Sequence, residues 1–443
     1  MSQVGRPRLL LFAAGDFAFN LYWQSAMLYL LFYYTDVLSI AMETAAAIYL
    51  VASVWDGVVS FAVGAFVDRR GSARRYRMAL IIGAVPLGLA FVTAYISPPV
   101  AGRAAVMFVL VGHLLFRTAY AVVNIPYLAM SARISPNSRD RSLVAGWRML
   151  AGTGAAVVVA MGTVPIGGWL MGVPAGPRDF LGAALLFAGI ASVLLLVVGA
   201  TFRDAVPVVA VPRPSILTSL VSVVRNRAFV TLSGAMMAMI VATTILSKSV
   251  LYYFKYFLAD EPAGQLALAS MMAVSAAAVP LWMLVARVIG VRRLWFLLVG
   301  LCSVGLTSFA VVDLPRAGAM QLFLVGMQAT TVGLHFAFWA MLPDTIEWGQ
   351  RASDFRAEGT VFGLASLLQR VAIGIATAVL GMGFGSAGYT ANVVQSPATL
   401  ADMRATIALV PLGFFLLSGA LMWFNPLRAG THDRLRAEMA GEQ

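Results

Sequence analysis

The sequence has few of the side chains on which most enzymes and metal sites depend. It contains one cysteine, Cys302, and three histidines that lie far apart among 443 residues. A disulfide framework needs paired cysteines, and a structural zinc site needs four ligands close together, which one cysteine and three scattered histidines do not indicate. The HExxH, P-loop and nucleophile-elbow motifs are missing too. We therefore expect neither an enzyme nor a metal or cofactor site.

Charge is equally scarce, and apolar residues take its place. Charged residues make up 11% of the chain and hydrophobic residues 60%, with a mean hydropathy of +0.86. One soluble core could not enclose so much apolar surface, whereas a bilayer takes about 20 apolar residues per spanning helix. The sequence predicts an all-α membrane protein with twelve transmembrane helices, which begin near Leu9, Met42, Met78, Ala104, Leu143, Phe180, Ala228, Gln265, Trp295, Ala317, Gly359 and Met403.

The links between these helices are short, and the longest of them divides the chain. It covers about residues 203–227 and contains PVVAVPRP, whose prolines are typical of an exposed tether. We expect an N-terminal six-helix half at 1–202, a cytoplasmic central loop at 203–227, and a C-terminal six-helix half with a short tail at 228–443. The first apolar run is too long for a signal peptide and carries Asp16 and Asn20, so we interpret it as helix one.

Basic residues outnumber acidic ones by 31 to 19, which gives a net charge of +12. Nucleic-acid binding could explain such an excess, but cytoplasmic loops of membrane proteins also collect Lys and Arg. Most of the arginines fall in alternate loops, while the remaining loops hold Arg103, Arg178, Arg316, Arg404 and Lys255. This asymmetry predicts a multi-pass protein of the cell inner membrane with both termini in the cytoplasm and no nucleic-acid partner.

Six ionisable residues interrupt the apolar runs, and each costs roughly 2.5–3.5 kcal/mol at the centre of a spanning helix. Asp56, Arg117 and Arg370 fall near the centres of helices two, four and eleven, where a side chain cannot easily reach the interface. This position favours a functional role. A purely structural ion pair, such as Asp56 with Arg117, is the alternative.

The other three, Asp16, Arg148 and Lys248, lie closer to helix ends. A long cationic side chain can reach the interface from there, so anchoring is a full alternative for the two cations. A function in the transport path is the preferred hypothesis for Asp16.

The polar residues of two helices share single faces. Arg117, Tyr120 and Asn124 follow i, i+3, i+7, and Asp56 and Ser60 follow i, i+4. Apolar helices with one polar stripe are expected where several pack around a water-filled path, as in solute carriers.

Several motifs make the prediction more specific. GAFVDRRGSARR (64–75) resembles the loop signature of the major facilitator superfamily. A stronger set runs from the first to the eleventh helix and resembles the glycoside-pentoside-hexuronide:cation symporters, the melibiose-permease branch of that superfamily. This set comprises GDFAFN (15–20), FYYTDVL (32–38), WDGVVS (55–60), NIPY (124–127), LYYFKYFL (251–258), MLPDTIEWGQ (341–350) and FRAEGTVFG (355–363).

The resemblance implies two pseudo-symmetric six-helix halves, alternating access, and uptake of a sugar driven by Na⁺, Li⁺ or H⁺. In the family pattern, acidic residues of helices one and two help bind substrate and cation, and these correspond to Asp16 and Asp56. A cavity arginine of helix five corresponds to Arg148. A lysine of helix eleven appears as Arg370, which keeps the charge but changes the donor geometry.

Two departures from the family pattern bear on the coupling ion. The second aspartate of helix two is Ser60 here, and the acidic residue of helix four is Asn124. Because Na⁺ prefers several oxygen ligands that include negative charge, the loss of two carboxylates favours H⁺ over Na⁺. A lone aspartate in a cavity can carry a proton, and Asp56 is our candidate for the coupling residue.

The charge balance favours an acidic substrate. The four intramembrane cations Arg117, Arg148, Lys248 and Arg370 outnumber the anions Asp16 and Asp56, and the planar arginine fork suits a carboxylate. We therefore favour a hexuronide or another acidic saccharide over a neutral disaccharide. Tyr120 and Asn124 belong to the same predicted substrate site, and His335 could join it as a neutral hydrogen-bonding partner.

A second group of charges lies at predicted cytoplasmic helix ends and is interpreted as a gate. Its members are Asp68, Arg69, Asp344, Glu347, Arg351 and Arg356.

The sequence thus predicts a secondary active transporter that imports a sugar, glycoside or acidic saccharide with a cation. Its expected partners are the saccharide, the coupling cation and the lipid bilayer, with a monomer as the simplest assembly. The alternatives are an uncoupled facilitator, and a non-sugar solute or lipid transporter or an exporter on the same fold, because fold alone does not fix function.

Overall fold

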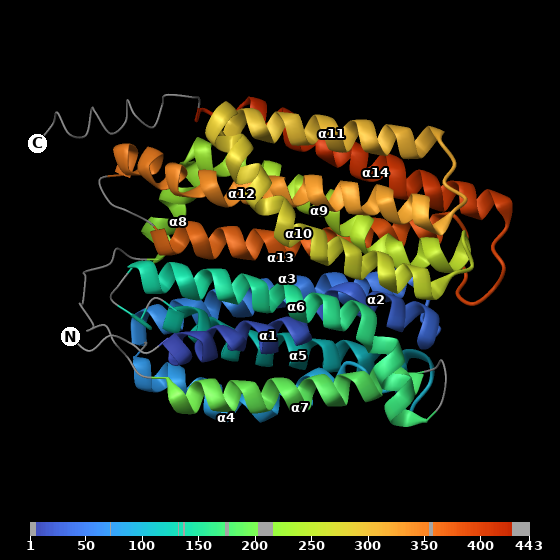
Figure 1. Cartoon of the computed structure of the whole chain (residues 1–443), viewed down its shortest axis with the longest axis horizontal. Helices are drawn as coiled ribbons and strands as arrows, with labels where there is room; N and C mark the ends of the chain where they lie inside the picture. Colours follow the sequence, from blue (N-terminus) through green and yellow to red (C-terminus); the bar gives the residue numbers. More distant parts are fainter. Residues whose placement is uncertain are drawn as a thin grey trace, which may run out of the picture.

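The computed structural model describes residues 6–70, 72–131, 133–135, 138–172, 177–202, 216–353 and 358–427, and every regular element in these ranges is a helix (Figure 1). Between its end turns, a helix satisfies its backbone hydrogen bonds within the segment, which a lipid environment requires. The long elements are α1 (Arg6–Leu28), α3 (Met42–Arg70), α4 (Ala73–Thr93), α5 (Gly102–Ser131), α6 (Ser138–Met171), α7 (Pro177–Thr201), α9 (Arg227–Tyr256), α10 (Glu261–Ile289), α11 (Val291–Val311), α12 (Ala317–Ser353), α13 (Glu358–Ser386) and α14 (Pro397–Trp423).

Eleven of these helices in the described ranges, α3 to α7 and α9 to α14, are long and apolar enough to cross a membrane. The remaining long helix, α1, packs among them although Asp16, Asn20 and Gln24 make it more polar. All twelve lie where apolar runs predict them, so the all-α membrane fold is confirmed.

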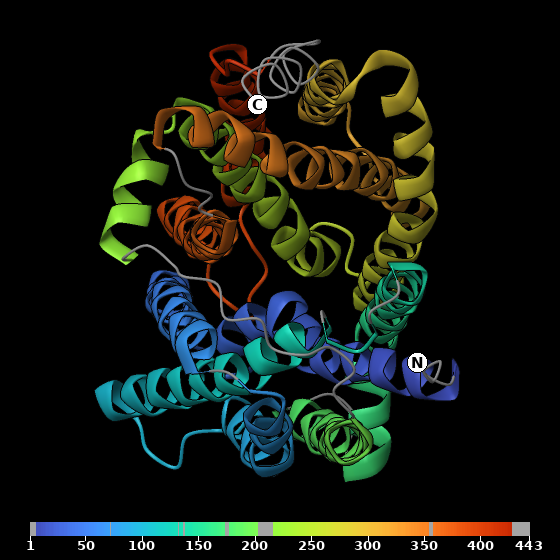
Figure 2. The same cartoon turned by 90° about the vertical axis from the view of Figure 1, so that its left-hand side faces the viewer.

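The long helices form two groups of six. The blue to green helices α1 and α3 to α7 pack on one another, and the lime to red helices α9 to α14 form the second group beside them (Figures 1 and 2). Helix α1 begins and helix α14 ends at the same end of the bundle, on the left in Figure 1, and this end is here called the terminal end. The other is called the far end.

The two groups meet along two seams, α3 with α13 and α6 with α10. The α3–α13 seam is close because small residues line it. A Cβ placed on Gly374 would lie 2.9 Å from the Cβ of Ser53, and one on Gly57 would lie 3.4 Å from the Cγ of Leu367. The seam therefore holds the two groups in contact along the length of both helices.

The first helix is interrupted near the far end. α1 ends at Leu28, a single turn α2 (Leu30–Phe32) follows, and a π-helical turn η1 (Tyr33–Val37) completes the segment. The last turn of a helix has main-chain carbonyls without intrahelical donors, and two carbonyls in the last turn of α1 accept bonds from side chains described below.

The segment between the two groups is not a simple tether. Residues 203–215, which contain the proline-rich stretch, lie outside the described residues, but α8 (Ile216–Arg225) is a helix that packs against α9, α12 and α13. Its apolar residues recur with helical spacing, and the prolines just before it concealed this signal.

Candidate functional site

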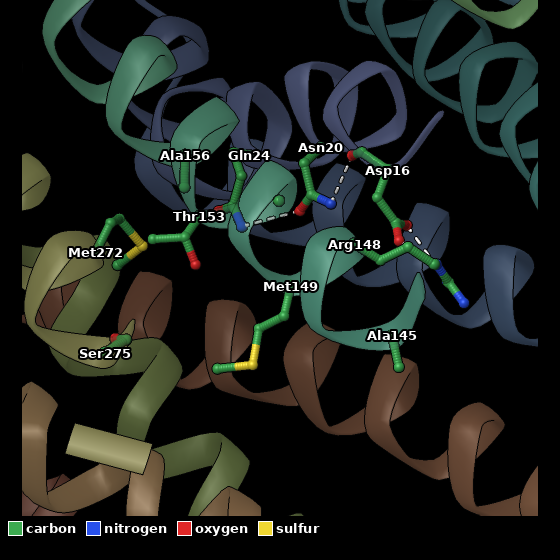
Figure 3. Close-up of a pocket in the computed structure, with 11 residues that line it drawn as sticks. Asp16, Asn20, Gln24, Ala145, Arg148, Met149, Thr153, Ala156, Met272 and Ser275 are labelled. Carbon is green, nitrogen blue, oxygen red and sulfur yellow. Dashed lines mark hydrogen bonds and ion pairs between the residues drawn. The ribbon is translucent and has the colours of Figure 1, made fainter. Parts of the chain in front are cut away.

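A cavity of about 500 Å³ lies between α1, α6 and α10, at the boundary of the two helix groups (Figure 3). Its lining combines charged, amide and hydroxyl groups with two methionines. The lining residues are Asp16, Asn20, Gln24, Ala145, Arg148, Met149, Gly152, Thr153, Ala156, Met272 and Ser275.

An ion pair between Asp16 of α1 and Arg148 of α6 forms one wall of the cavity. Nε of Arg148 donates to one carboxylate oxygen, and a terminal nitrogen donates to the other at 3.3 Å, so the contact is two-pronged. The side chains keep 14% and 20% of their surface exposed. The guanidinium also lies over the ring of Tyr127, 5.3 Å from its centroid. The pair is therefore held in place and still accessible to a solute.

A polar stripe continues from this pair along α1. Asn20 donates to the main-chain oxygen of Asp16 at 2.9 Å, and Gln24 donates to the side-chain oxygen of Asn20 at 3.4 Å (Figure 3). Because the three residues are four apart, they line one helix face toward the cavity. The stripe offers donors and acceptors at regular spacing.

The second carboxylate, Asp56 of α3, lies deeper. Its side chain is 1% exposed and pairs with both Arg117 of α5, at 3.3 Å, and Arg370 of α13. The indole of Trp23 lies beneath both guanidinium groups, with centroid distances of 5.0 and 5.3 Å. Ser60 donates to the other oxygen of Asp56 over 3.4 Å. Since Arg370 belongs to the second helix group, this cluster joins the two groups.

Arg117 extends the cluster toward the far end. It donates to the hydroxyl of Tyr49 at 3.3 Å and to Nε2 of His113 at 3.1 Å. Tyr49 in turn donates to the carbonyl of Ala26 at 3.0 Å, in the last turn of α1. The Nζ of Lys248 lies 3.8 Å from the centroid of the Tyr49 ring.

The structure thus brings most of the predicted site residues into two neighbouring clusters, but some lie apart. Asn124 is buried in α5 without lining the cavity. Tyr120 packs edge-on against Phe19 and also contacts Trp23, whose ring lies beneath Arg117 and Arg370, so it lies beside the Asp56 cluster. His335 contacts the carbonyl of Thr331 on its own helix, and it does not line the cavity either.

The predicted gate falls largely on residues whose side chains are not described. The side chains of Asp68, Arg69 and Arg351, and all of Arg356, lie outside the described residues. Asp344 and Glu347 lie on α12, and both are partly buried. The gate therefore stays a prediction.

Sequence reasoning missed a cluster at the far end, centred on Asp36 of η1. Its carboxylate accepts from Lys255 at 2.8 Å, from Tyr256 at 2.5 Å and from Tyr389 at 2.7 Å, and its main-chain oxygen accepts from Asn392 at 2.7 Å. Burial, followed by the neighbouring Tyr252 and Asp36, raises the pKa of Tyr389, so its hydroxyl stays protonated and donates. This Asp36 cluster ties the two helix groups together at the far end.

A signal for the Asp36 cluster was present in the sequence. Asp36 follows three aromatic residues and a threonine in FYYTDVL, and Lys255 stands in LYYFKYFL. Each charge taken alone resembled a helix end, and their pairing across 219 positions has no local pattern.

An all-helical bundle of two six-helix groups, with a polar cavity and paired charges between them, defines a multi-span membrane transporter. The chain belongs to the family described as MFS/sugar transport protein, whose model matches residues 11–429. The expected family resemblance is therefore confirmed, and the protein is a secondary transporter and not an enzyme.

Curated relatives match along most of the chain. The glucuronide carrier protein homolog of Escherichia coli (strain K12) is 28% identical, over 94% of this chain and 91% of that protein. A putative sulfoquinovose importer of Salmonella typhimurium is also 28% identical, over 93% and 88%. The isoprimeverose transporter of Lactiplantibacillus pentosus is 26% identical, over 94% and 87%.

Solved structures share the fold at low identity. A bacterial homolog of the human lysosomal transporter Spinster, in an inward-facing and unoccupied conformation, has a TM-score of 0.72 at 10% identity, covering 96% of this chain and all of that one. A D-xylose–proton symporter has a TM-score of 0.66 at 14% identity, covering 94% and 96%.

Proposed function

We propose that this transporter imports an acidic saccharide of the hexuronide class together with H⁺. The observation that carries the proposal is the cavity between α1, α6 and α10, with its two-pronged Asp16–Arg148 ion pair. Its volume of about 500 Å³ falls within the range of roughly 300–1,000 Å³ that is typical of small-molecule sites.

The lining suits a sugar. Asn20, Gln24, Thr153 and Ser275 supply amide and hydroxyl groups for sugar hydroxyls, and Met149 and Met272 supply apolar contact for a ring face. Ser275 is oriented by Gln328, which donates to its hydroxyl at 2.9 Å. Because Ser275 and Met272 belong to the second helix group, a bound solute touches both groups.

The charges favour an anionic solute over a neutral one. Two carboxylates, Asp16 and Asp56, face the three arginines that pair with them, and Lys248 adds a further cation. The substrate carboxylate would take the guanidinium fork of Arg148 in place of Asp16. Two relatives named for a glucuronide and for sulfoquinovose, both acidic sugars, support this choice.

Alternating access follows from the position of the ion pairs. The Arg370–Asp56 pair joins the helix groups at mid-depth, and the Asp36 cluster joins them at the far end. We propose that the terminal end is cytoplasmic, so that the structure is closed toward the outside. Opening the far end requires separation of the Asp36 cluster. Binding of both substrate and ion then permits the far end to close again.

Coupling to H⁺ is favoured over Na⁺ by the oxygen ligands near Asp56. Ser60 supplies a neutral oxygen, and one oxygen of Asp56 is already engaged by two guanidinium groups. The role of Asp56 as proton carrier stays a prediction, since protonation would require that its two ion pairs open.

The test is uptake in proteoliposomes of a labelled hexuronide and a labelled neutral disaccharide, under an imposed pH gradient or an imposed Na⁺ gradient. We expect accumulation of the hexuronide with the pH gradient. Arg148→Lys keeps the charge but loses the fork, and should lower uptake about tenfold. Arg404→Lys, at an ion pair with Asp313 away from the cavity, is the matched control.

Other outcomes would contradict the proposal. Na⁺-driven accumulation of the neutral sugar would reject both the acidic substrate and the proton. Equilibration without accumulation would identify an uncoupled facilitator, and absence of hexuronide uptake under either gradient would reject the hexuronide as substrate.

A further inference from the structure

Lysine is rare in this chain, and one of its two lysines is buried. The 31 basic residues comprise 29 arginines, Lys248 and Lys255. Lys255 pairs with the carboxylate of Asp36, whereas Lys248, in the last third of α9, is 4% exposed and takes part in no ion pair among the described residues. Arginine is never deprotonated in proteins, but a buried lysine can release its proton.

The carbonyl of Met27 and the ring of Tyr49 surround the amine of Lys248 and form a site for a single cation, here called the Lys248 site. Its Nζ donates to the carbonyl of Met27 at 3.2 Å, in the last turn of α1. The face of Tyr49 lies 3.8 Å away. The negative end of an interrupted helix and an aromatic face both attract a cation, and interrupted helices in transporters bind coupling ions in this way.

The Lys248 site also meets the hydrogen-bonding needs of a neutral amine. An ammonium group has three N–H donors, and the described surroundings supply the carbonyl of Met27 and the hydroxyl of Tyr49 as partners, while burial without a carboxylate penalises the charge. The Lys248 site therefore accommodates both the charged and the neutral form of the amine, which a proton carrier requires.

The charged and titratable groups around the Lys248 site connect it to the transport cycle. Tyr49 from α3 faces Lys248, as do Arg117 and His113 from α5, while α1 offers a main-chain carbonyl. Arg117 holds the hydroxyl of the same Tyr49 and shares Asp56 with Arg370. When Arg370 withdraws, Asp56 neutralises Arg117 alone, and the positive potential at Lys248 falls.

We propose that Lys248 is the group that binds the coupling proton. The Nζ lone pair takes a proton from water while the far end is open and returns it to water at the terminal end. Closure of the Arg370–Asp56 pair raises the local positive charge and expels the proton. The inference rests on the proposed H⁺ symport, but the site itself can be tested without any substrate.

The experiment measures charge displacement after rapid pH jumps on substrate-free proteoliposomes adsorbed to a solid-supported membrane. The wild type should give a displacement that titrates with pH. Lys248→Met should abolish it, and so should Lys248→Arg, because arginine keeps its proton. Arg404→Lys, at an ion pair with Asp313 away from Lys248, is the control and should keep the displacement and its midpoint.

Asp56→Asn distinguishes the rival carrier. With Lys248 as carrier, the displacement persists and its midpoint moves to lower pH, because Arg117 loses its counterion. If Asp56→Asn abolishes the displacement, or Lys248→Met retains that of the wild type, the proposal is overturned. Size-exclusion elution checks folding of each variant. Lys248→Gln replaces Lys248→Met if the latter does not fold, and Asp56→Asn/Arg370→Gln replaces an unfolded Asp56→Asn.

The two proposals fail in different ways. A pH-dependent displacement that needs Lys248, without accumulation of hexuronide, would retain the proton site and reject the substrate. Proton-driven hexuronide uptake that survives Lys248→Met would retain the substrate and reject Lys248 as the proton site.

Discussion

The two intramembrane carboxylates of the first helix group, Asp16 and Asp56, are both paired with arginine, but their surroundings differ. Asp16 has one guanidinium partner within its own group and faces a cavity, with 14% of its side chain exposed. Asp56 has two partners, one of them from the other helix group, and is 1% exposed. An accessible pair can exchange partners with a solute. An enclosed pair that spans the two helix groups instead forms or breaks as the groups move relative to each other.

The largest effect should come from breaking the enclosed pair. Asp56→Asn leaves the buried Arg117 and the partly buried Arg370 without their shared counterion, and should lower the free energy of unfolding by about 3–5 kcal/mol. Thermal unfolding in detergent measures the loss. Adding Arg370→Gln should restore part of it, and a double variant no more stable than the single one would show that the pair contributes little.

A smaller effect, on the binding of an acidic ligand and not of a neutral one, should follow from Asp16→Asn. The accessible pair contributes at most about 1 kcal/mol to stability, but Asp16 competes with a substrate carboxylate for Arg148. Hexuronide should therefore bind several-fold more tightly and a neutral sugar no more tightly, as measured by calorimetry. Equal weakening of both ligands would show that Asp16 contacts the sugar directly.

The smallest effect should come from Ser60→Ala. The Ser60 hydroxyl reaches Asp56 over 3.4 Å, a long hydrogen bond, so its loss should change stability by less than about 1 kcal/mol. Proton-driven uptake should persist. A large loss of uptake would show that Ser60 is a ligand of the coupling ion.

Much of this architecture was predictable, because membrane helices are encoded locally. Apolar runs located all twelve long helices, and the cost of intramembrane charge singled out Asp56, Arg117 and Arg370 before any contact was known. The pairing of Arg370 with Asp56 spans 314 positions, and periodicity carries no information on such contacts. The same holds for the Asp36 cluster and for Tyr49, which is shared by two cations.

The interruption of the first helix also escaped prediction, for a different reason. Residues 29–37 read as a continuation of an apolar run, without the proline or glycine that normally marks a break. The change from α to π geometry depends on tertiary partners, such as the Asp36 cluster.

The close seam between α3 and α13 has a consequence for how the two groups can move. Side chains interlock there at Gly374 and Gly57, so the groups cannot slide past each other along this line without collision. We expect them instead to rock about an axis that crosses the seam, so that α3 and α13 spread apart at one end while they stay packed at the other. Arg370 moves away from Asp56 when the far end spreads, and the close approach that the glycines allow sets how far the two helices must part.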